Sequence, residues 1–190
     1  RPLFRALSGA VSVITKVLID LSPTSNGFYS LSTPKIFAAD FEIEIDFVST
    51  NQSGNQHLTG AVSSNRYEIL FASNNNLIVY DGSIGVSVHN ITGLPYLNGE
   101  LHTIKATRVG GLQSLFINGT LVASSTRAVG NATIDCLGSR ERTTSFFNGI
   151  ISDVKLTDLT TPANSLSFGL DELTANTETN NGVTLTYQNI

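Results

Sequence analysis

Residues 101–123 read LHTIKATRVGGLQSLFINGTLVA and contain three short runs that are rich in β-branched and other apolar residues. Gly110-Gly111 and Asn118-Gly119 separate these runs, and glycine and asparagine readily take the positive φ angles of tight hairpin turns. The stretch therefore predicts three consecutive antiparallel strands.

The segment FEIEIDFV, residues 41–48, gives the strongest single strand signal in the chain. Its apolar residues alternate with Glu42, Glu44 and Asp46, which is the period of two of a strand with one buried face. Together with the apolar faces of the other expected strands, it predicts a core that contains Phe41, Ile43, Ile45, Phe47, Ile104, Leu115, Ile117, Ile151 and Val154.

Turn residues recur about every ten positions and separate further short strands. We expect strands within residues 66–72, 77–80 and 83–89, and two more near the end of the chain at 165–170 and 182–187. The polar stretch 174–181 is predicted to be a loop. Regular spacing of this kind is typical of an all-β domain built as a two-sheet antiparallel sandwich.

The first ten residues are predicted to be a linker from an upstream region, and residues 11–190 a single domain. Residues 11–21 fit two interpretations. The 4-3 spacing of apolar residues from Leu3 to Leu21 is that of a helical seam, as in a short coiled coil of three chains. The β-branched residues that alternate from Val11 to Ile19 favour a strand instead.

Composition excludes several classes of protein. The chain has 190 residues, 41% of them hydrophobic and 14% charged, with a formal net charge of −4, so neither a disordered acidic tail nor a basic nucleic-acid binder is expected. No apolar run approaches the roughly 20 residues of a membrane-spanning helix, so we expect no membrane insertion. The single cysteine, Cys136, cannot form an intrachain disulfide and is expected to be a small buried apolar residue.

Three segments resemble the laminin-G-like domains of the concanavalin A-like lectin/glucanase superfamily. In LHTIKATRVGGLQSLFINGTLVAS, His102 opens a strand and Asn118-Gly119 forms a hairpin turn, as in that family. SFFNGIISDVKLTDL, residues 145–159, resembles the closing strand, and FEIEIDFV the early core strand. The resemblance covers about residues 28–159 and implies a jelly-roll sandwich. It departs from the family at Leu101, where a tryptophan is usual.

The Ser/Thr/Asn-rich composition and the closing segment SFGLDELTANTETNNGVTLTYQNI are similar to modules of bacteriophage tail fibres and other virion proteins. This similarity implies a place on the outer surface of a virion. It also implies a host-surface glycan or a neighbouring virion protein as partner, and a homotrimer in the full-length protein.

The sequence contains both kinds of side chain that a sugar-binding site uses. Planar polar groups hydrogen-bond the hydroxyls of a sugar, and aromatic rings cover the apolar side of its ring. One group lies in the loop NQSGNQH, residues 51–57, and the other on the strands and loops that follow. The candidate ligand-binding residues are Asn51, Gln52, Asn55, Gln56, His57, Arg66, Tyr67, Tyr80, His89 and Tyr96.

Calcium is a candidate cofactor, because laminin-G-like domains often hold it at one rim of the sandwich through oxygen ligands. Asp81, Asp135 and Asp153 are the candidate ligands that the resemblance implies. An aspartate that the family places before the strand at 66–72 falls near Asn65 here, which departs from the pattern.

Glu42, Glu44 and Asp46 raise the question of catalysis, because glycoside hydrolases of the same superfamily carry acidic residues at alternate positions of a strand. In those enzymes aspartate lies between two glutamates, beside tryptophans that this chain lacks. We expect these carboxylates to form the solvated face of a strand near the edge of its sheet, with no catalytic residues. The sequence thus favours a non-catalytic recognition or adhesion module that binds cell-surface carbohydrate; a structural spacer or capsid-decorating domain is the alternative.

Overall fold

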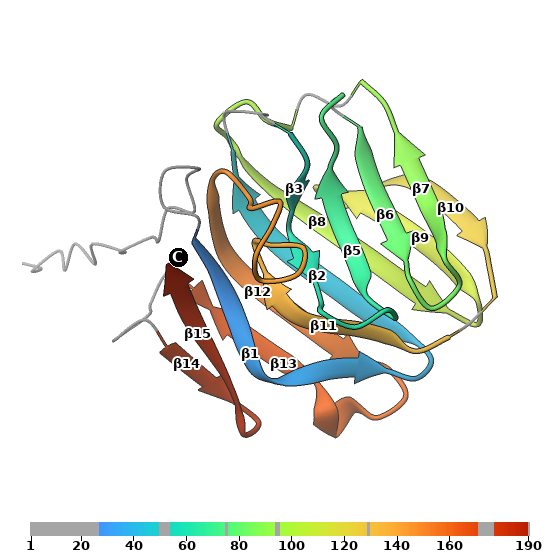
Figure 1. Ribbon diagram of the computed structural model, residues 1–190. Coiled ribbons are helices and arrows are strands. Elements are labelled where there is room, and N and C mark those ends of the chain that lie inside the picture. Colours follow the sequence, from blue (N-terminus) through green and yellow to red (C-terminus); the bar gives the residue numbers. More distant parts are fainter. Residues whose placement is uncertain are drawn as a thin grey trace, which may run out of the picture.

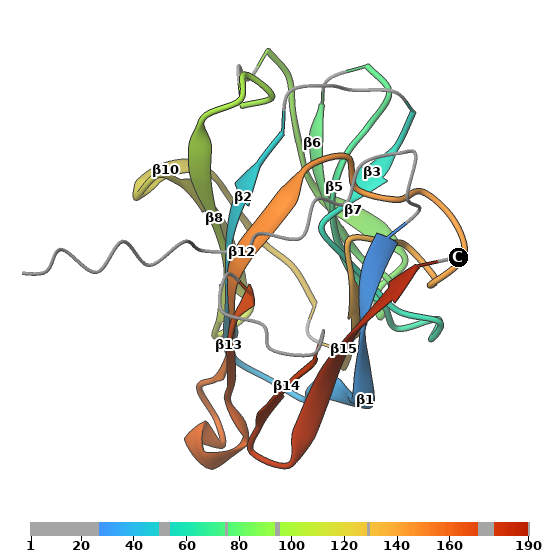
Figure 2. The ribbon, with the colours of Figure 1, turned by 90° about the vertical axis from the view of Figure 1, so that its left-hand side faces the viewer.

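The structure of the chain, a computed structural model, describes residues 27–49, 54–74, 76–93, 96–128, 130–170 and 177–189. Antiparallel strands form two layers that face each other (Figure 1, Figure 2). The first layer is one six-stranded sheet, whose strands in sheet order are β10 (Thr120–Thr126), β9 (Leu112–Ile117), β8 (Leu101–Val109), β2 (Phe41–Val48), β12 (Ile150–Asp158) and β13 (Leu166–Gly169).

The second layer consists of two smaller sheets. A five-stranded sheet has the order β14 (Thr177–Asn180), β15 (Val183–Asn189), β1 (Gly27–Phe37), β11 (Ala132–Leu137) and β4 (Thr59–Gly60). A four-stranded sheet continues this layer as β3 (Gln56–His57), β5 (Tyr67–Phe71), β6 (Leu77–Asp81) and β7 (Val86–Ile91). A parallel bridge between Arg66 and Thr133 joins the two sheets.

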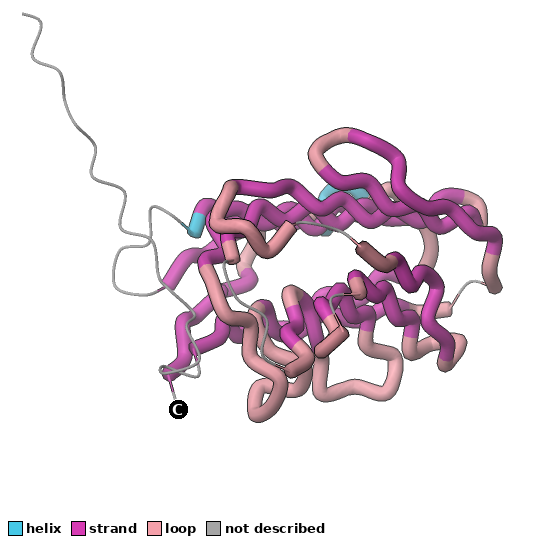
Figure 3. The backbone as a smooth tube through the Cα atoms, turned by 90° about the horizontal axis from the view of Figure 1, so that it is seen from above, coloured by secondary structure: helices cyan, strands magenta, loops and turns pink. Residues whose placement is uncertain are grey.

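Helical structure in the described residues is limited to a short 3-10 turn, η1 (Pro162–Asn164), and the 3-10 conformation of Leu170, and Figure 3 shows strands and loops almost throughout. No helix in this part of the chain is long and apolar enough to cross a membrane.

The core lies between the two layers and follows the alternation seen in the sequence. Every second residue of β2 is buried and the residues between them are half-exposed. All nine residues predicted for the core are buried. At one end of the core the Phe47 ring lies 5.5 Å from that of Phe71 and 6.0 Å from that of Phe147, so aromatic side chains of both layers interlock there.

The three strands predicted within residues 101–123 are confirmed as β8, β9 and β10. Gly110 and Gly111 take φ angles of 57° and 82°, and Asn118 and Gly119 take 48° and 78°. These positive values are those of the two-residue hairpin turns that the sequence predicted. The strands expected at 66–72, 77–80, 83–89, 165–170 and 182–187 are present as β5, β6, β7, β13 and β15.

Two expectations about the strands are wrong. The predicted loop at 174–181 includes β14, which pairs with β15 across a turn at Asn181 and Gly182. Its residues are exposed or half-exposed, so the apolar alternation that marks a strand is missing. Strand β2 lies between β8 and β12 inside its sheet, not near the edge, because strands distant in sequence flank it on both sides. The linker at 1–10 and the two interpretations of 11–21 lie outside the described residues.

A buried polar cluster crosses the core. Arg108 and Asp81 are both fully buried, with 3.6 Å between Nη1 of the arginine and Oδ2 of the carboxylate. Arg108 also donates to the carbonyl oxygen of Ala39 from Nε at 2.8 Å and from Nη2 at 2.6 Å. The amide of Gln113 donates to Asp81 at 3.3 Å and accepts from the hydroxyl of Tyr67 at 3.1 Å. Burial lowers the pKa of Arg108, which Asp81 partly offsets.

Candidate functional site

A hollow of about 340 Å³ lies on the outer face of the four-stranded sheet. Alternation along β5 sends Tyr67, Ile69 and Phe71 into the core and leaves Glu68 and Leu70 on the outer face. The loop at residues 138–147, which follows β11, borders the hollow on one side. The lining residues are Asn55, His57, Arg66, Glu68, Leu70, Ile78, Tyr80, Ser87, Arg140 and Ser145.

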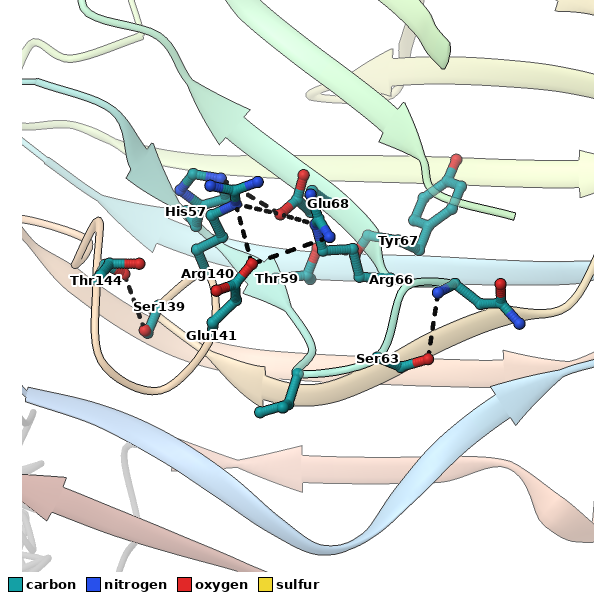
Figure 4. A network of polar contacts seen from close by, with 12 residues as sticks. His57, Thr59, Ser63, Arg66, Tyr67, Glu68, Ser139, Arg140, Glu141 and Thr144 are labelled. Atoms are coloured by element: carbon teal, nitrogen blue, oxygen red, sulfur yellow. Dashed lines mark hydrogen bonds and ion pairs between the residues drawn. The ribbon is translucent and has the colours of Figure 1, made fainter. Parts of the chain in front are cut away.

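Glu68 is the centre of the polar contacts in the hollow. Its side chain is 5% exposed, and its Oε1 accepts hydrogen bonds from Nε of Arg66 at 2.8 Å and from Nε of Arg140 at 3.1 Å. Nε2 of His57 lies 3.7 Å from the same oxygen. Figure 4 shows the three side chains converging on Glu68. One buried carboxylate thus holds two cationic side chains in fixed positions.

The outer part of the hollow combines charge with an aromatic ring. The guanidinium carbon of Arg66 lies 5.5 Å from the centre of the Tyr80 ring, within the range of a cation–π contact. Oε1 of Glu141 lies 3.9 Å from Nη1 of Arg66 and 3.6 Å from Nε of Arg140. The Arg66 side chain is 20% exposed, and those of Arg140 and Glu141 are each 39% exposed. Both arginines therefore reach from the buried Glu68 to solvent.

His57 is buried beside these charges. Burial, the largest cause, and the nearby charges of Arg140 and Arg66 together lower its pKa from the ordinary 6.5 to about 4, against a backbone contact with Ser145 that raises it. The imidazole is therefore neutral at pH 7. Its Nδ1 is buried and has no hydrogen-bond partner among the described residues.

The depressed pKa of His57 makes stability depend on pH. Because the unfolded chain takes up a proton near pH 6.5 and the folded protein only near pH 4, stability is lost as the pH falls through this window. We expect His57 alone to lower the free energy of unfolding by about 2 kcal/mol between pH 7 and pH 5. Urea unfolding at both pH values should show a smaller decrease for His57→Gln than for the native chain. Equal decreases would contradict this account.

The loop at 138–147 is fixed by backbone hydrogen bonds at both of its ends. The amide of Gly138 donates to the carbonyl of Leu58 at 3.0 Å, and the amide of Phe147 donates to the carbonyl of Gly138 at 2.8 Å. Within the loop, the amide of Arg140 donates to the carbonyl of Thr144 at 3.1 Å. Gly60 on β4 lies directly against this loop, and a Cβ atom there would clash with the Ser139 and Arg140 carbonyl oxygens. Arg140 is thus positioned by the fold.

The structure brings four of the ten predicted ligand-binding residues into this hollow: Asn55, His57, Arg66 and Tyr80. Two others, Asn51 and Gln52, lie outside the described residues. The remaining four, Gln56, Tyr67, His89 and Tyr96, do not line it.

These four residues are engaged in packing or hydrogen bonding within the fold instead. Gln56 is buried, and its Oε1 accepts a hydrogen bond from the Asn148 amide at 2.9 Å. Tyr67 points into the core, which corrects its prediction as a ligand-binding residue. His89 is buried on β7, and the ring of Tyr96 packs edge-on against that of His102 at 5.1 Å.

Sequence reasoning missed the acidic residue at the centre of the site and the contribution of the loop. Glu68 belongs to a segment predicted as a strand, and its position between the inward-facing Tyr67 and Ile69 would have placed it on the outer face. Arg140 and Glu141 carry no such signal, since 72 residues separate Arg140 from Glu68. The pairing of β11 with β4 and the bridge between Arg66 and Thr133 bring the loop next to β3 and β5, and both join segments that are distant in the sequence.

The three aspartates considered for calcium lie on three different strands, β6, β11 and β12. Asp81 is fully buried with Arg108, so its prediction as a rim residue is wrong. Asp135 accepts from the Val62 amide at 3.1 Å and pairs with Arg142 at 3.4 Å. Among the described residues, no group of three or more His, Cys, Asp or Glu side chains is arranged to hold a metal ion.

The alternating carboxylates of β2 are engaged by the strands beside them. Glu42 pairs with Lys105 and Glu44 with Lys155, each at 2.9 Å. Asp46 accepts a hydrogen bond from the Thr103 hydroxyl at 2.6 Å. These cross-strand contacts lie on the outer face of the six-stranded sheet, the solvated strand face that the sequence predicted.

The family described as the concanavalin A-like lectin/glucanases superfamily, in its laminin-G form, matches residues 28–166. The chain belongs to this superfamily. The match confirms the resemblance at the level of the superfamily and its antiparallel sandwich. No curated protein sequence matches the chain.

Solved structures of this lectin-like fold are similar to the chain at low sequence identity. A putative carbohydrate binding protein from Bacteroides ovatus has a TM-score of 0.65 at 15% identity, over 86% of this chain and 56% of its own. Domains LG4-5 of the mouse laminin alpha1 chain have a TM-score of 0.56 at 16% identity, over 83% and 44%. The Ruminococcus gnavus IT-sialidase CBM40 has a TM-score of 0.50 at 17% identity, over 63% and 76%. The chain thus spans about half the length of the first two.

Proposed function

We propose that this laminin-G-like domain is a non-catalytic module that binds carbohydrate in the hollow on the outer face of β3, β5 and β6. The observation that carries the proposal is the pair Arg66 and Arg140, fixed by the buried Glu68 and open to solvent beside the Tyr80 ring. The similarity to a protein titled a putative carbohydrate binding protein agrees with it.

The hollow suits a sugar in two respects. The Tyr80 ring is half-exposed, and a ring of this kind can cover the apolar side of a sugar, while guanidinium N–H groups donate to its oxygens. Among the described residues, no hydrogen bond uses the terminal nitrogens of Arg140, so they are available to a ligand. Because Glu68 already orders both arginines, less side-chain entropy is lost when a ligand binds.

A second hollow of similar size lies on the outer face of the six-stranded sheet and is lined by Glu44, Thr103, Lys105, Phe116 and Gly119. Its lysine is already paired with Glu42 at 2.9 Å, and Glu44 is paired with Lys155. The second hollow thus has one cationic side chain among its lining residues, Lys105, whereas the first has two, Arg66 and Arg140, which favours the first hollow as the binding site.

A glycan array followed by calorimetry tests the proposal. We expect Tyr80→Ala to weaken binding of the strongest array glycan by about tenfold or more, which corresponds to about 1.4 kcal/mol, because the ring that covers the sugar is lost. Tyr80 is the cross-strand neighbour of Glu68, but the hydrogen bonds that hold Arg66 and Arg140 to Glu68 do not involve it, so the arginines keep their anchor. Lys105→Ala, on the other layer, is the control and should bind as the native domain does.

An array that binds no glycan would contradict the proposal and would favour the structural spacer that the sequence left as the alternative. Loss of binding in Lys105→Ala together with normal binding in Tyr80→Ala would move the site to the second hollow. The virion setting, the trimer and the host-surface glycan remain predictions from the sequence.

A further inference from the structure

We infer that the hollow recognises glycans that carry a carboxylate, and that this carboxylate replaces Glu141 between Arg66 and Arg140. The inference rests on the proposed function and specifies its ligand. Arg66 and Arg140 share the buried carboxylate of Glu68, and the carboxylate of Glu141 lies farther from both.

Each of the two arginines donates to Glu68 from its Nε atom alone. Both Nε atoms donate to the same oxygen, Oε1, at 2.8 and 3.1 Å. The guanidinium group is planar and can bind a carboxylate through two parallel hydrogen bonds. Since Glu68 takes only Nε from each arginine, the terminal nitrogens remain for a second carboxylate.

Glu141 is the second carboxylate near the two arginines, and it lies beside Nη1 of Arg66 and beside Nε of Arg140, the atom that already donates to Glu68. Its Oε1 is 3.6 Å from Nε of Arg140 and 3.9 Å from Nη1 of Arg66, and both distances exceed those of a hydrogen bond. Because 39% of the Glu141 side chain is exposed, its ion pairs with the arginines contribute little to stability. A ligand carboxylate that formed short bidentate bonds would therefore displace it.

The charge balance of the site favours an acidic ligand once Glu141 has moved away. Arg66 and Arg140 carry two positive charges, Glu68 carries one negative charge, and the buried His57 is neutral at pH 7. The remaining charge of +1 matches one carboxylate.

A carboxylate is the anion that Arg66 and Arg140 already bind in this structure, in the side chain of Glu68. A sulfate ester can also take two hydrogen bonds from a guanidinium group, so a sulfated sugar is the competing anion in the test. Uronic and sialic acids both supply the required group, so the test must include one ligand of each kind.

The test compares acidic glycans with counterparts in which the carboxylate is blocked. Sialyllactose and trigalacturonic acid are each compared with their methyl esters, which keep the sugar rings and remove the charge, and sulfated lactose supplies a competing anion. Calorimetry with the native domain should give at least tenfold tighter binding for a carboxylated member than for its neutral counterpart. Whether sialyllactose or trigalacturonic acid gives this difference identifies the source of the carboxylate.

Glu141→Gln tests the displacement directly. We expect it to tighten binding of the carboxylated glycan about threefold to tenfold, because the competing charge is removed, and to leave binding of the neutral counterpart unchanged. Glu42→Gln, the control, removes one negative charge from the outer face of the six-stranded sheet and should leave the binding of both glycans unchanged. Arg140→Ala should abolish the preference for the acid, with a thermal melt to establish that this variant is folded.

The possible results separate this inference from the proposed function. Equal binding of acidic and neutral glycans, still weakened by Tyr80→Ala, would overturn the inference and leave the proposed function intact. Preference for the sulfated sugar, or weaker binding of the carboxylated glycan by Glu141→Gln, would also overturn it. If no glycan binds the native domain, both fail.

Discussion

Asp81→Ala is expected to lower the free energy of unfolding by about 3–5 kcal/mol, because it leaves a buried arginine without its carboxylate. Asp81 and Arg108 are both fully buried, and Asp81 also accepts hydrogen bonds from Gln113 and Ser83. Removing the carboxylate therefore leaves Arg108 and Gln113, both fully buried, with one partner fewer where water does not reach them, and also removes the partner of the half-exposed Ser83. Urea unfolding followed by fluorescence measures the change.

The matched control for this prediction is Glu44→Ala, which also removes a carboxylate paired with a basic side chain. The Glu44 and Lys155 side chains are 34% and 57% exposed, and a pair of this kind is worth less than about 1 kcal/mol. A loss at Asp81 no larger than the loss at Glu44 would show that the buried cluster is not needed to hold the two layers together.

Gly60→Ala is expected to destabilise the domain by about 3 kcal/mol and to impair carbohydrate binding at the same time. The added Cβ atom would meet the carbonyl oxygens of Ser139 and Arg140, and backbone atoms cannot move aside as a flexible side chain can. The loop at 138–147 must shift, which pulls Arg140 away from Glu68. Thermal unfolding and calorimetry with the strongest array glycan measure the two effects.

Thr143→Ala provides the comparison within the same loop. Thr143 is exposed, so its truncation should change stability by less than about 0.5 kcal/mol and leave binding unchanged. If Gly60→Ala were as mild as Thr143→Ala, the close approach of β4 to the loop would not position the arginine.

The strands and the core were predictable because they depend on short-range patterns. The alternation in β2 and the Asn118-Gly119 turn are readable over a few residues, and both have the predicted structure. Strand β14 was missed for the same reason, because its exposed side chains carry no apolar alternation and only its pairing with β15 makes it a strand.

The site was predictable only in part, since its centre depends on contacts between distant segments. Tyr67 and Tyr80 were equally good candidates in the sequence, but the strands turn Tyr67 into the core and Tyr80 outward. The partner of Asp81 is Arg108, 27 positions away, and Arg140 reaches Glu68 across 72 positions. Neither pairing follows from composition or spacing.

The location of the bound glycan is the most direct test of the central claim, that this domain binds carbohydrate on the outer face of the four-stranded sheet. An NMR titration of the isotopically labelled domain with the strongest array glycan maps it residue by residue. We predict that the largest amide shifts fall on β3, β5, β6 and the loop at 138–147. Shifts concentrated around Thr103, Lys105 and Phe116 on the six-stranded sheet would contradict the account.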